Sequence, residues 1–147
     1  MSIPAAPSAE ETPFCQQGAG TSGPNIAPAA AVSLGDEHRE RGRLHEAAAA
    51  YRWAVDSDDS DIAPWAAGQL GGVLREQGRL DEAATAYQWA VDSGSDIAPF
   101  VSVTLGDVRW EQDRLEEAAT AYQWAVDSDH PDIAPLAAVK LQSMKEH

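Results

Sequence analysis

The sequence predicts an all-α repeat fold, because one helical unit of about 35 residues is written three times and begun a fourth time. The octet AYQWAVDS occurs at residues 86–93 and again at 121–128, and a near copy, AYRWAVDS, occurs at 50–57. The tripeptide Ile-Ala-Pro marks the start of each unit, at positions 26, 62, 97 and 133. We therefore expect repeats at about 26–60, 61–95 and 96–131, followed by a single helix at about 132–147.

Each unit has the pattern of two helices. In the middle unit, small and apolar residues recur at helical offsets of 0, 3, 4 and 7, namely Ala67, Leu70, Gly71 and Leu74. A proline in the first turn and a glycine after the last turn are typical of helix ends, here Pro64 and Gly78. The second helix repeats the pattern from Leu80 to Val91 with an alanine-rich seam. Because the turn between the two helices is short, we expect them to lie antiparallel and close together.

The composition and net charge of the chain indicate where the protein is expected to be located and which partners are not expected. Residues 1–24 are rich in Pro, Ala, Ser and Gly, and we expect a disordered tail without the features of a signal peptide. The single cysteine, Cys15, lies in this tail, and no run is long and apolar enough to cross a membrane. We expect a cytoplasmic protein. The formal net charge of −14 argues against nucleic acid as a partner, because nucleic-acid binding usually needs a basic face.

The pattern L-G-x(6)-G-x-L-x-E-A-x(3)-Y-x-x-A-V resembles the tetratricopeptide repeat. In the middle unit its residues are Leu70, Gly71, Gly78, Leu80, Glu82, Ala83, Tyr87, Ala90 and Val91. The resemblance covers about residues 26–147 and implies a right-handed α-solenoid of three helix-turn-helix repeats with a C-terminal capping helix. It also implies that the first helices line a concave side and that the fold serves to bind proteins or peptides.

The tryptophan of the octet has two interpretations. Trp89 lies roughly 160° from the packing face of its helix at 100° per residue, and Trp53 and Trp124 occupy the same position in their repeats. Either each ring rests on the neighbouring repeat, or the three form an exposed apolar row on the convex side. In the second case the row would bind a partner or a second copy, which would give a homodimer.

A second group of residues is predicted to line the concave groove. Trp65, Gly68, Gly72 and Arg75 share one stripe of the middle first helix, and equivalent positions hold Arg39, Phe100, Val103 and Trp110. A glycine inside a helix costs roughly 1 kcal/mol relative to alanine, so Gly68 and Gly72 require an explanation. Either they serve close packing or sequence drift, or they leave an aromatic-lined trough for a side chain of a bound peptide.

No cofactor, metal or catalytic group is expected. The four histidines have no metal-ligand spacing, and the acidic run at 56–61 lacks the glycine and closing glutamate of a calcium loop. The protein is therefore not expected to be an enzyme. We expect an adaptor or scaffold that binds a protein segment in its groove. The alternatives are a self-associating structural module that uses the tryptophan row or the C-terminal cap, and an acidic regulator that occupies a basic site.

Overall fold

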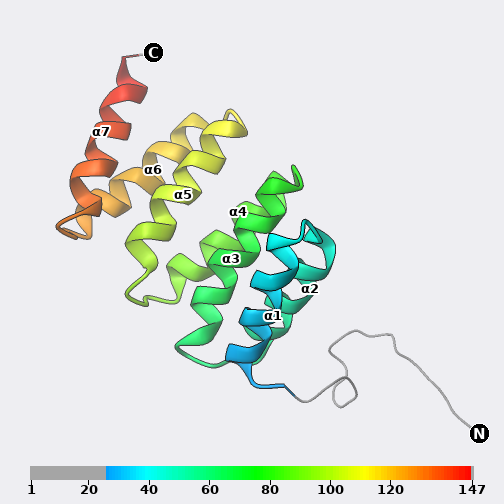
Figure 1. Cartoon of the computed structure of the whole chain (residues 1–147). Coiled ribbons are helices and arrows are strands. Elements are labelled where there is room, and N and C mark those ends of the chain that lie inside the picture. Colours follow the sequence, from blue (N-terminus) through cyan, green and yellow to red (C-terminus); the bar gives the residue numbers. More distant parts are fainter. Residues whose placement is uncertain (1–25, 147) are drawn as a thin grey trace, which may run out of the picture. The chain divides into compact units, whose positions relative to one another are not determined.

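The computed structural model describes residues 26–146, which form seven helices and divide into two compact units between Ala63 and Pro64. The helices are coloured along the chain in Figure 1. The predicted tail at 1–24 and His147 lie outside the described residues. The helix bounds are α1 (Pro28–Glu40), α2 (Leu44–Asp56), α3 (Ile62–Glu76), α4 (Leu80–Asp92), α5 (Ala98–Glu111), α6 (Leu115–Asp127) and α7 (Ile133–Lys145).

The first unit is built on the helix pair α1 and α2, which pack against each other along their lengths. The second helix contributes most of the buried surface, through Tyr51 and four alanines. Trp53 leans back onto the start of the unit, and its Nε1 donates a hydrogen bond to the carbonyl of Ile26 at 3.4 Å. The start of α3, at Ile62 and Ala63, also belongs to this unit.

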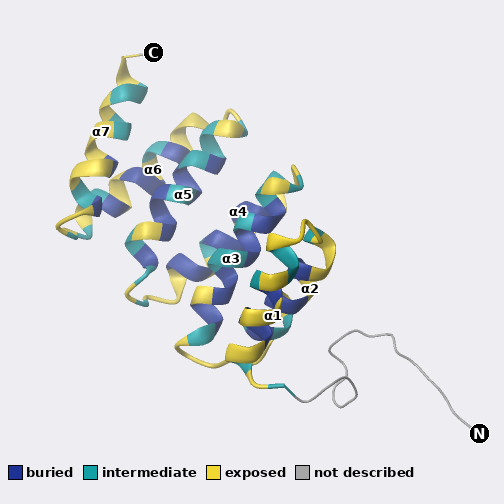
Figure 2. Cartoon of the chain, viewed as in Figure 1, coloured by how far each residue is buried: buried dark blue, intermediate teal, exposed yellow. Residues whose placement is uncertain are grey.

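The second unit contains the rest of α3 and the helices α4 to α7. Within it, α5 packs against α4 and α6, and α7 packs against α6 and touches α5. Figure 2 shows that the buried residues of α5 and α6 face each other, whereas much of α7 is exposed. Each helix thus packs mainly on its neighbours in sequence, which is the arrangement expected of a repeat protein.

The three turns within the helix pairs use one backbone design. In each, an N–H donates to a carbonyl five residues earlier, from Arg43 to His38, Arg79 to Leu74 and Arg114 to Arg109. Such a turn needs one residue with positive φ, which Gly42 and Gly78 supply at 76°. In the third pair Asp113 adopts the same conformation at 63°, because aspartate tolerates the left-handed region better than most residues.

The acidic run at 56–61 forms the turn before α3. The Oδ1 atom of Asp59 accepts hydrogen bonds from the N–H groups of Asp61 and Ile62, both at 2.9 Å. It therefore satisfies two of the free donors at the start of a helix. In the turn before α7 the Nδ1 atom of His130 has the same role, and it accepts from Asp132 and Ile133 at 3.2 and 3.4 Å.

A tyrosine packs directly onto a glycine backbone in every helix pair. A Cβ atom placed on Gly35 would lie 2.6 Å from the ring of Tyr51. The same distance is 2.7 Å for Gly71 and Tyr87, and 2.5 Å for Gly106 and Tyr122. Real Cβ atoms do not approach other atoms so closely, so only glycine allows this separation between the two helices.

Two of these tyrosines also bond the residue that follows the glycine. The hydroxyl of Tyr51 donates to Asp36, and that of Tyr122 donates to Asp107. The equivalent residue in the middle repeat is Gly72, which has no side chain to accept the bond. Burial raises the pKa of Tyr51 and Tyr122 well above the ordinary value of 10.0, and the hydrogen bond to a carboxylate raises it further.

We expect Gly106→Ala to lower the free energy of unfolding by roughly 1–3 kcal/mol, because the added methyl group would force Tyr122 or the helices apart. Gly68→Ala is the matched control. Its Cβ would meet only Val101 Cγ2 at 3.7 Å, an ordinary contact, so alanine should stabilise α3 by up to about 1 kcal/mol. Urea denaturation followed by circular dichroism measures both. A neutral Gly106→Ala would contradict the proposed contact.

Alkaline pH should destabilise the protein through Tyr51 and Tyr122. Their folded pKa values are raised, so the folded state keeps protons that the unfolded chain loses above pH 10.0. The stabilisation is present in full below that pH and is lost as the pH rises further. Urea unfolding from about pH 8 to about pH 11 should show a steeper decline for the wild type than for a Tyr51→Phe/Tyr122→Phe variant. Equal slopes would show that these hydroxyls are not responsible.

Candidate functional site

Three large apolar side chains are exposed at one repeated position of the first helices in the second unit. Trp65 on α3, Phe100 on α5 and Leu136 on α7 each follow the proline near the start of their helix. Their exposed fractions are 48, 46 and 45%. We call these residues the first-helix row. The residues that directly follow them, Ala66, Val101 and Ala137, are buried, whereas Val139 further along α7 is exposed as well.

Gly68 lies one turn beyond Trp65 on the same helix. A Cβ there would contact only Val101 at 3.7 Å, so packing does not require this glycine. It differs in this respect from Gly71, where a tyrosine ring occupies the space. Gly72 is half-buried. The local geometry thus does not support close packing as the reason for Gly68, whereas sequence drift and a trough for a bound side chain both remain predictions.

Ion pairs link successive first helices at their C-terminal halves. Arg75 on α3 pairs with Glu111 on α5 through two hydrogen bonds, and Lys140 on α7 pairs with Asp107 on α5 at 3.1 Å. The hydrogen bond with Glu111 raises the pKa of Arg75. Because its guanidinium already binds a carboxylate of this chain, Arg75 is poorly suited to hold the carboxylate of a ligand. Arg39 lies on α1 in the first unit.

Val103 and Trp110 belong to the C-terminal core. Val103 is buried in a cluster with Tyr122 of α6 and with Ile133 and Ala137 of α7. Trp110 packs at the edge of this cluster, where its ring meets that of Tyr122 edge-on at 6.5 Å. The structure therefore leaves Trp65, Phe100 and Leu136 exposed, and it packs Val103 and Trp110 in the cluster that α7 helps to form.

The octet tryptophans differ in exposure. Trp89 on α4 and Trp124 on α6 are 43 and 42% exposed, whereas Trp53 on α2 is half-buried beside Ile26. Each of the two exposed rings lies on the outer side of its helix, away from the buried tyrosine two residues earlier. Both interpretations of the tryptophans remain predictions, because partial exposure is compatible with each.

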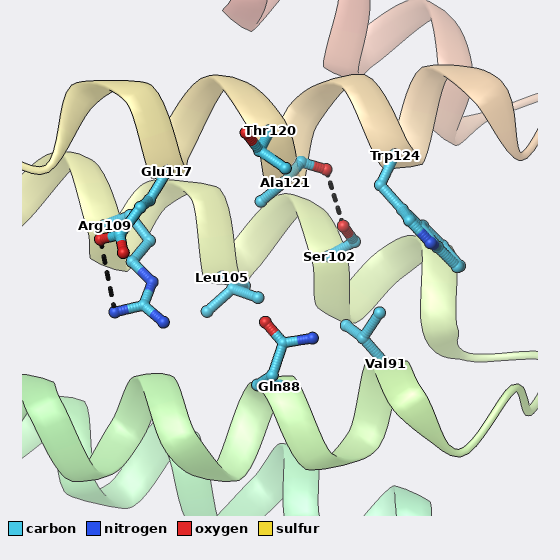
Figure 3. A pocket seen from close by; sticks show the side chains of 9 residues that line it. All are labelled: Gln88, Val91, Ser102, Leu105, Arg109, Glu117, Thr120, Ala121 and Trp124. Atoms are coloured by element: carbon cyan, nitrogen blue, oxygen red, sulfur yellow. Dashed lines mark hydrogen bonds and ion pairs between the residues drawn. The ribbon is translucent and has the colours of Figure 1, made fainter.

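Trp124 also borders a pocket of about 210 Å³ that opens between α4 and α6 over α5. Figure 3 shows Trp124 at one end and Arg109 with Glu117 at the other. The remaining lining residues are Gln88, Val91, Ser102, Leu105, Thr120 and Ala121. The floor is sealed by Ser102, whose hydroxyl donates to the carbonyl of Ala121 at 2.7 Å.

Two kinds of feature are absent from residues 26–146. No described helix combines the length and the apolar character needed to span a bilayer. Within the same residues, no group of three or more His, Cys, Asp and Glu side chains is arranged to hold a metal ion.

The comparisons with known proteins agree on the architecture. The family described as the tetratricopeptide repeat-like domain matches residues 16–146. The chain belongs to this family. A solved structure, the N-terminal domain of stress-induced protein-1 (STI-1) from C. elegans, superposes with a TM-score of 0.71 and 18% sequence identity. The match covers 80% of this chain and 94% of that one. No curated protein matches the sequence.

The membership confirms the predicted all-α fold of tetratricopeptide type, and it supports a general role in protein–protein interaction. Two features of the site, namely Leu136 and the pocket beside Trp124, were not predicted from the sequence. Leu136 aligns with Trp65 and Phe100 through the Ile-Ala-Pro period, so the alignment alone could have placed it in the row. The pocket beside Trp124 has no sequence signal, since it depends on how three helices of this tetratricopeptide array are spaced.

Replacing Trp53, Trp89 and Trp124 by Gln tests whether the octet tryptophans are structural. Because two of them are more than two-fifths exposed, each replacement should cost clearly less than the roughly 3–5 kcal/mol lost when a buried tryptophan is truncated. We expect wild type and variant to sediment alike as monomers at matched concentrations. A wild-type dimer that dissociates in the variant would instead support a homodimer formed through these residues.

Proposed function

We propose that this protein is an adaptor that binds a segment of another protein across its first helices, with the first-helix row as the anchor surface. The observation that carries the proposal is the exposure of Trp65, Phe100 and Leu136 at one repeated position. Membership of the tetratricopeptide repeat-like family supports protein binding in general. The predicted concave groove thus keeps Trp65, Gly68 and Phe100 and gains Leu136.

The energetics favour apolar anchoring. Fully burying a large apolar side chain is worth roughly 1.5–3 kcal/mol, and each of these side chains is still about half exposed. Covering all three with a partner would therefore contribute on the order of 1 kcal/mol for each residue. Aromatic residues that a partner covers are also among the side chains that most often dominate binding energy. Gly68, one turn beyond Trp65, adds no side chain of its own to this part of α3.

The spacing of the row suggests the form of the partner. Packed helices lie about 8–10 Å apart, and an extended chain rises about 3.3 Å per residue. An extended segment that crosses the first helices would therefore place an apolar side chain at roughly every third position. The ion pairs of Arg75 and Lys140 lie in the C-terminal halves of the first helices, away from the row in the first turns. Binding should consequently depend little on salt, unlike the occupation of a basic site by an acidic regulator.

A Trp65→Ala/Phe100→Ala variant should stay folded and lose its partner. Neither side chain is part of the buried core, so the circular dichroism spectrum and thermal midpoint should be nearly unchanged. Partners captured from the source organism and identified by mass spectrometry should be depleted with this variant. Trp89→Ala is the control, because it removes an equally exposed ring from a second helix. Unchanged capture by the double variant, or its unfolding, would refute the role of the row.

A further inference from the structure

A second surface of this molecule has the features of a binding site. It is the pocket between α4 and α6, on the opposite side of α5 from the cluster that holds Val103. We propose that this pocket receives an apolar side chain from a basic segment of a partner protein. The proposal is independent of the first-helix row, because no residue of that row lines the pocket.

The inner walls of the pocket call for an apolar occupant. Val91, Leu105 and Trp124 provide aliphatic and aromatic surface at one end (Figure 3). The polar group on the floor, the hydroxyl of Ser102, is already satisfied by the carbonyl of Ala121. The amide nitrogen of Gln88 likewise donates to Asp92 at 2.9 Å. An apolar side chain would therefore bury the indole edge without leaving these groups unpaired.

An ion pair between Arg109 and Glu117 closes the other end of the pocket. The guanidinium of Arg109, whose side chain is 18% exposed, lies 3.9 Å from the carboxylate of Glu117. Glu117 is 54% exposed and is also 3.7 Å from Arg114, so it turns its remaining surface to solvent. A cationic group of the partner would meet this carboxylate at the rim, whereas an anionic group would have to displace it from Arg109.

The charges around the pocket specify a basic partner. The helices α4 and α6 contain no lysine or arginine, and their acidic residues lie at the two ends, at Asp81, Glu82, Asp92, Glu116, Glu117 and Asp127. At one end Arg79, Arg109 and Arg114 pair with Glu82, Glu117 and Asp81, so the acids outnumber the bases around the pocket chiefly at the other end, at Asp92 and Asp127. The acidic ends of one helix are separated by eleven residues, or about 16 Å at 1.5 Å per residue. An extended segment covers this length in about five residues. The matching partner thus carries a central apolar side chain with basic residues beside it, which would meet Asp92 and Asp127 at one end.

A second copy of this chain is a poor occupant. Each copy carries a formal net charge of −14, and the helices α4 and α6 on either side of the pocket contain no lysine or arginine. Two such surfaces would repel each other in the absence of salt. A positively charged segment removes this repulsion and neutralises part of the excess negative charge.

The test uses the full chain and a fluorescein-labelled peptide, Lys-Lys-Ser-Phe-Ser-Lys-Lys, in a fluorescence anisotropy titration. A control peptide with serine in place of phenylalanine carries the same charge, so it measures attraction by charge alone. We expect the phenylalanine peptide to bind at least tenfold more tightly at one salt concentration, and the binding of both peptides to weaken as salt is raised. Equal binding of the two peptides would overturn the proposal.

Variants locate the site. Trp124→Ala removes the aromatic wall, and Thr120→Phe fills the pocket from an exposed helix position. Each should weaken binding of the phenylalanine peptide at least tenfold while circular dichroism remains that of the wild type. Trp89→Ala is the matched control, since this ring has the same repeat position and nearly the same exposure but does not line the pocket. It should change the affinity less than twofold.

Two further outcomes decide against the proposal. If neither pocket variant weakens the peptide, the pocket is not the site. If the wild type sediments as a dimer that Trp124→Ala dissociates, the occupant is a second copy. The Trp65→Ala/Phe100→Ala variant should bind the phenylalanine peptide as the wild type does, because its changes lie in the first-helix row. This result separates a failure of the pocket from a failure of the adaptor function.

Discussion

The packing of a tyrosine ring on a glycine backbone sets the distance between the two helices of each repeat. Gly106 and Tyr122 show the constraint most closely, since any Cβ at position 106 would lie 2.5 Å from the ring. The alanine-rich seam of the second helix, with Ala118 and Ala125 fully buried, follows from it, because larger side chains would hold the helices apart. The hydroxyl then reaches Asp107, which gives the buried ring a polar partner.

This close approach also determines which side chains remain at the surface. Once Tyr122 and the alanines are packed, Trp124 two residues along the helix lies on a different side, where it stays 42% exposed and borders the pocket. On α5, the glycine and the buried valines face its neighbours, whereas Phe100 in the first turn stays 46% exposed, with the ring of His130 against it at 4.9 Å. Both candidate surfaces of the molecule are therefore consequences of how each helix pair is packed, repeated at a fixed period.

Much of this arrangement could be predicted from the sequence, because it is local and periodic. The helix pairs, the turn at Gly78 and the small residues at Gly71 and Ala83 all have a signal within one repeat. The features that could not be predicted depend on contacts between repeats. The burial of Val103 and Trp110 depends on where α7 docks, and the pocket depends on the gap that α4 and α6 leave over α5. A repeat period carries no information on either.

The middle repeat departs from the other two at the positions nearest the first-helix row. It has Gly72 where Asp36 and Asp107 accept a tyrosine hydroxyl, and it has Gly68 where Val103 fills the C-terminal core. Each glycine weakens α3 by roughly 1 kcal/mol relative to alanine, which is a large fraction of the stability of a small array. Natural proteins tolerate such local losses mainly at functional sites. Because α3 also exposes Trp65, the weakened helix and the exposed ring support the proposal that the middle repeat takes part in binding.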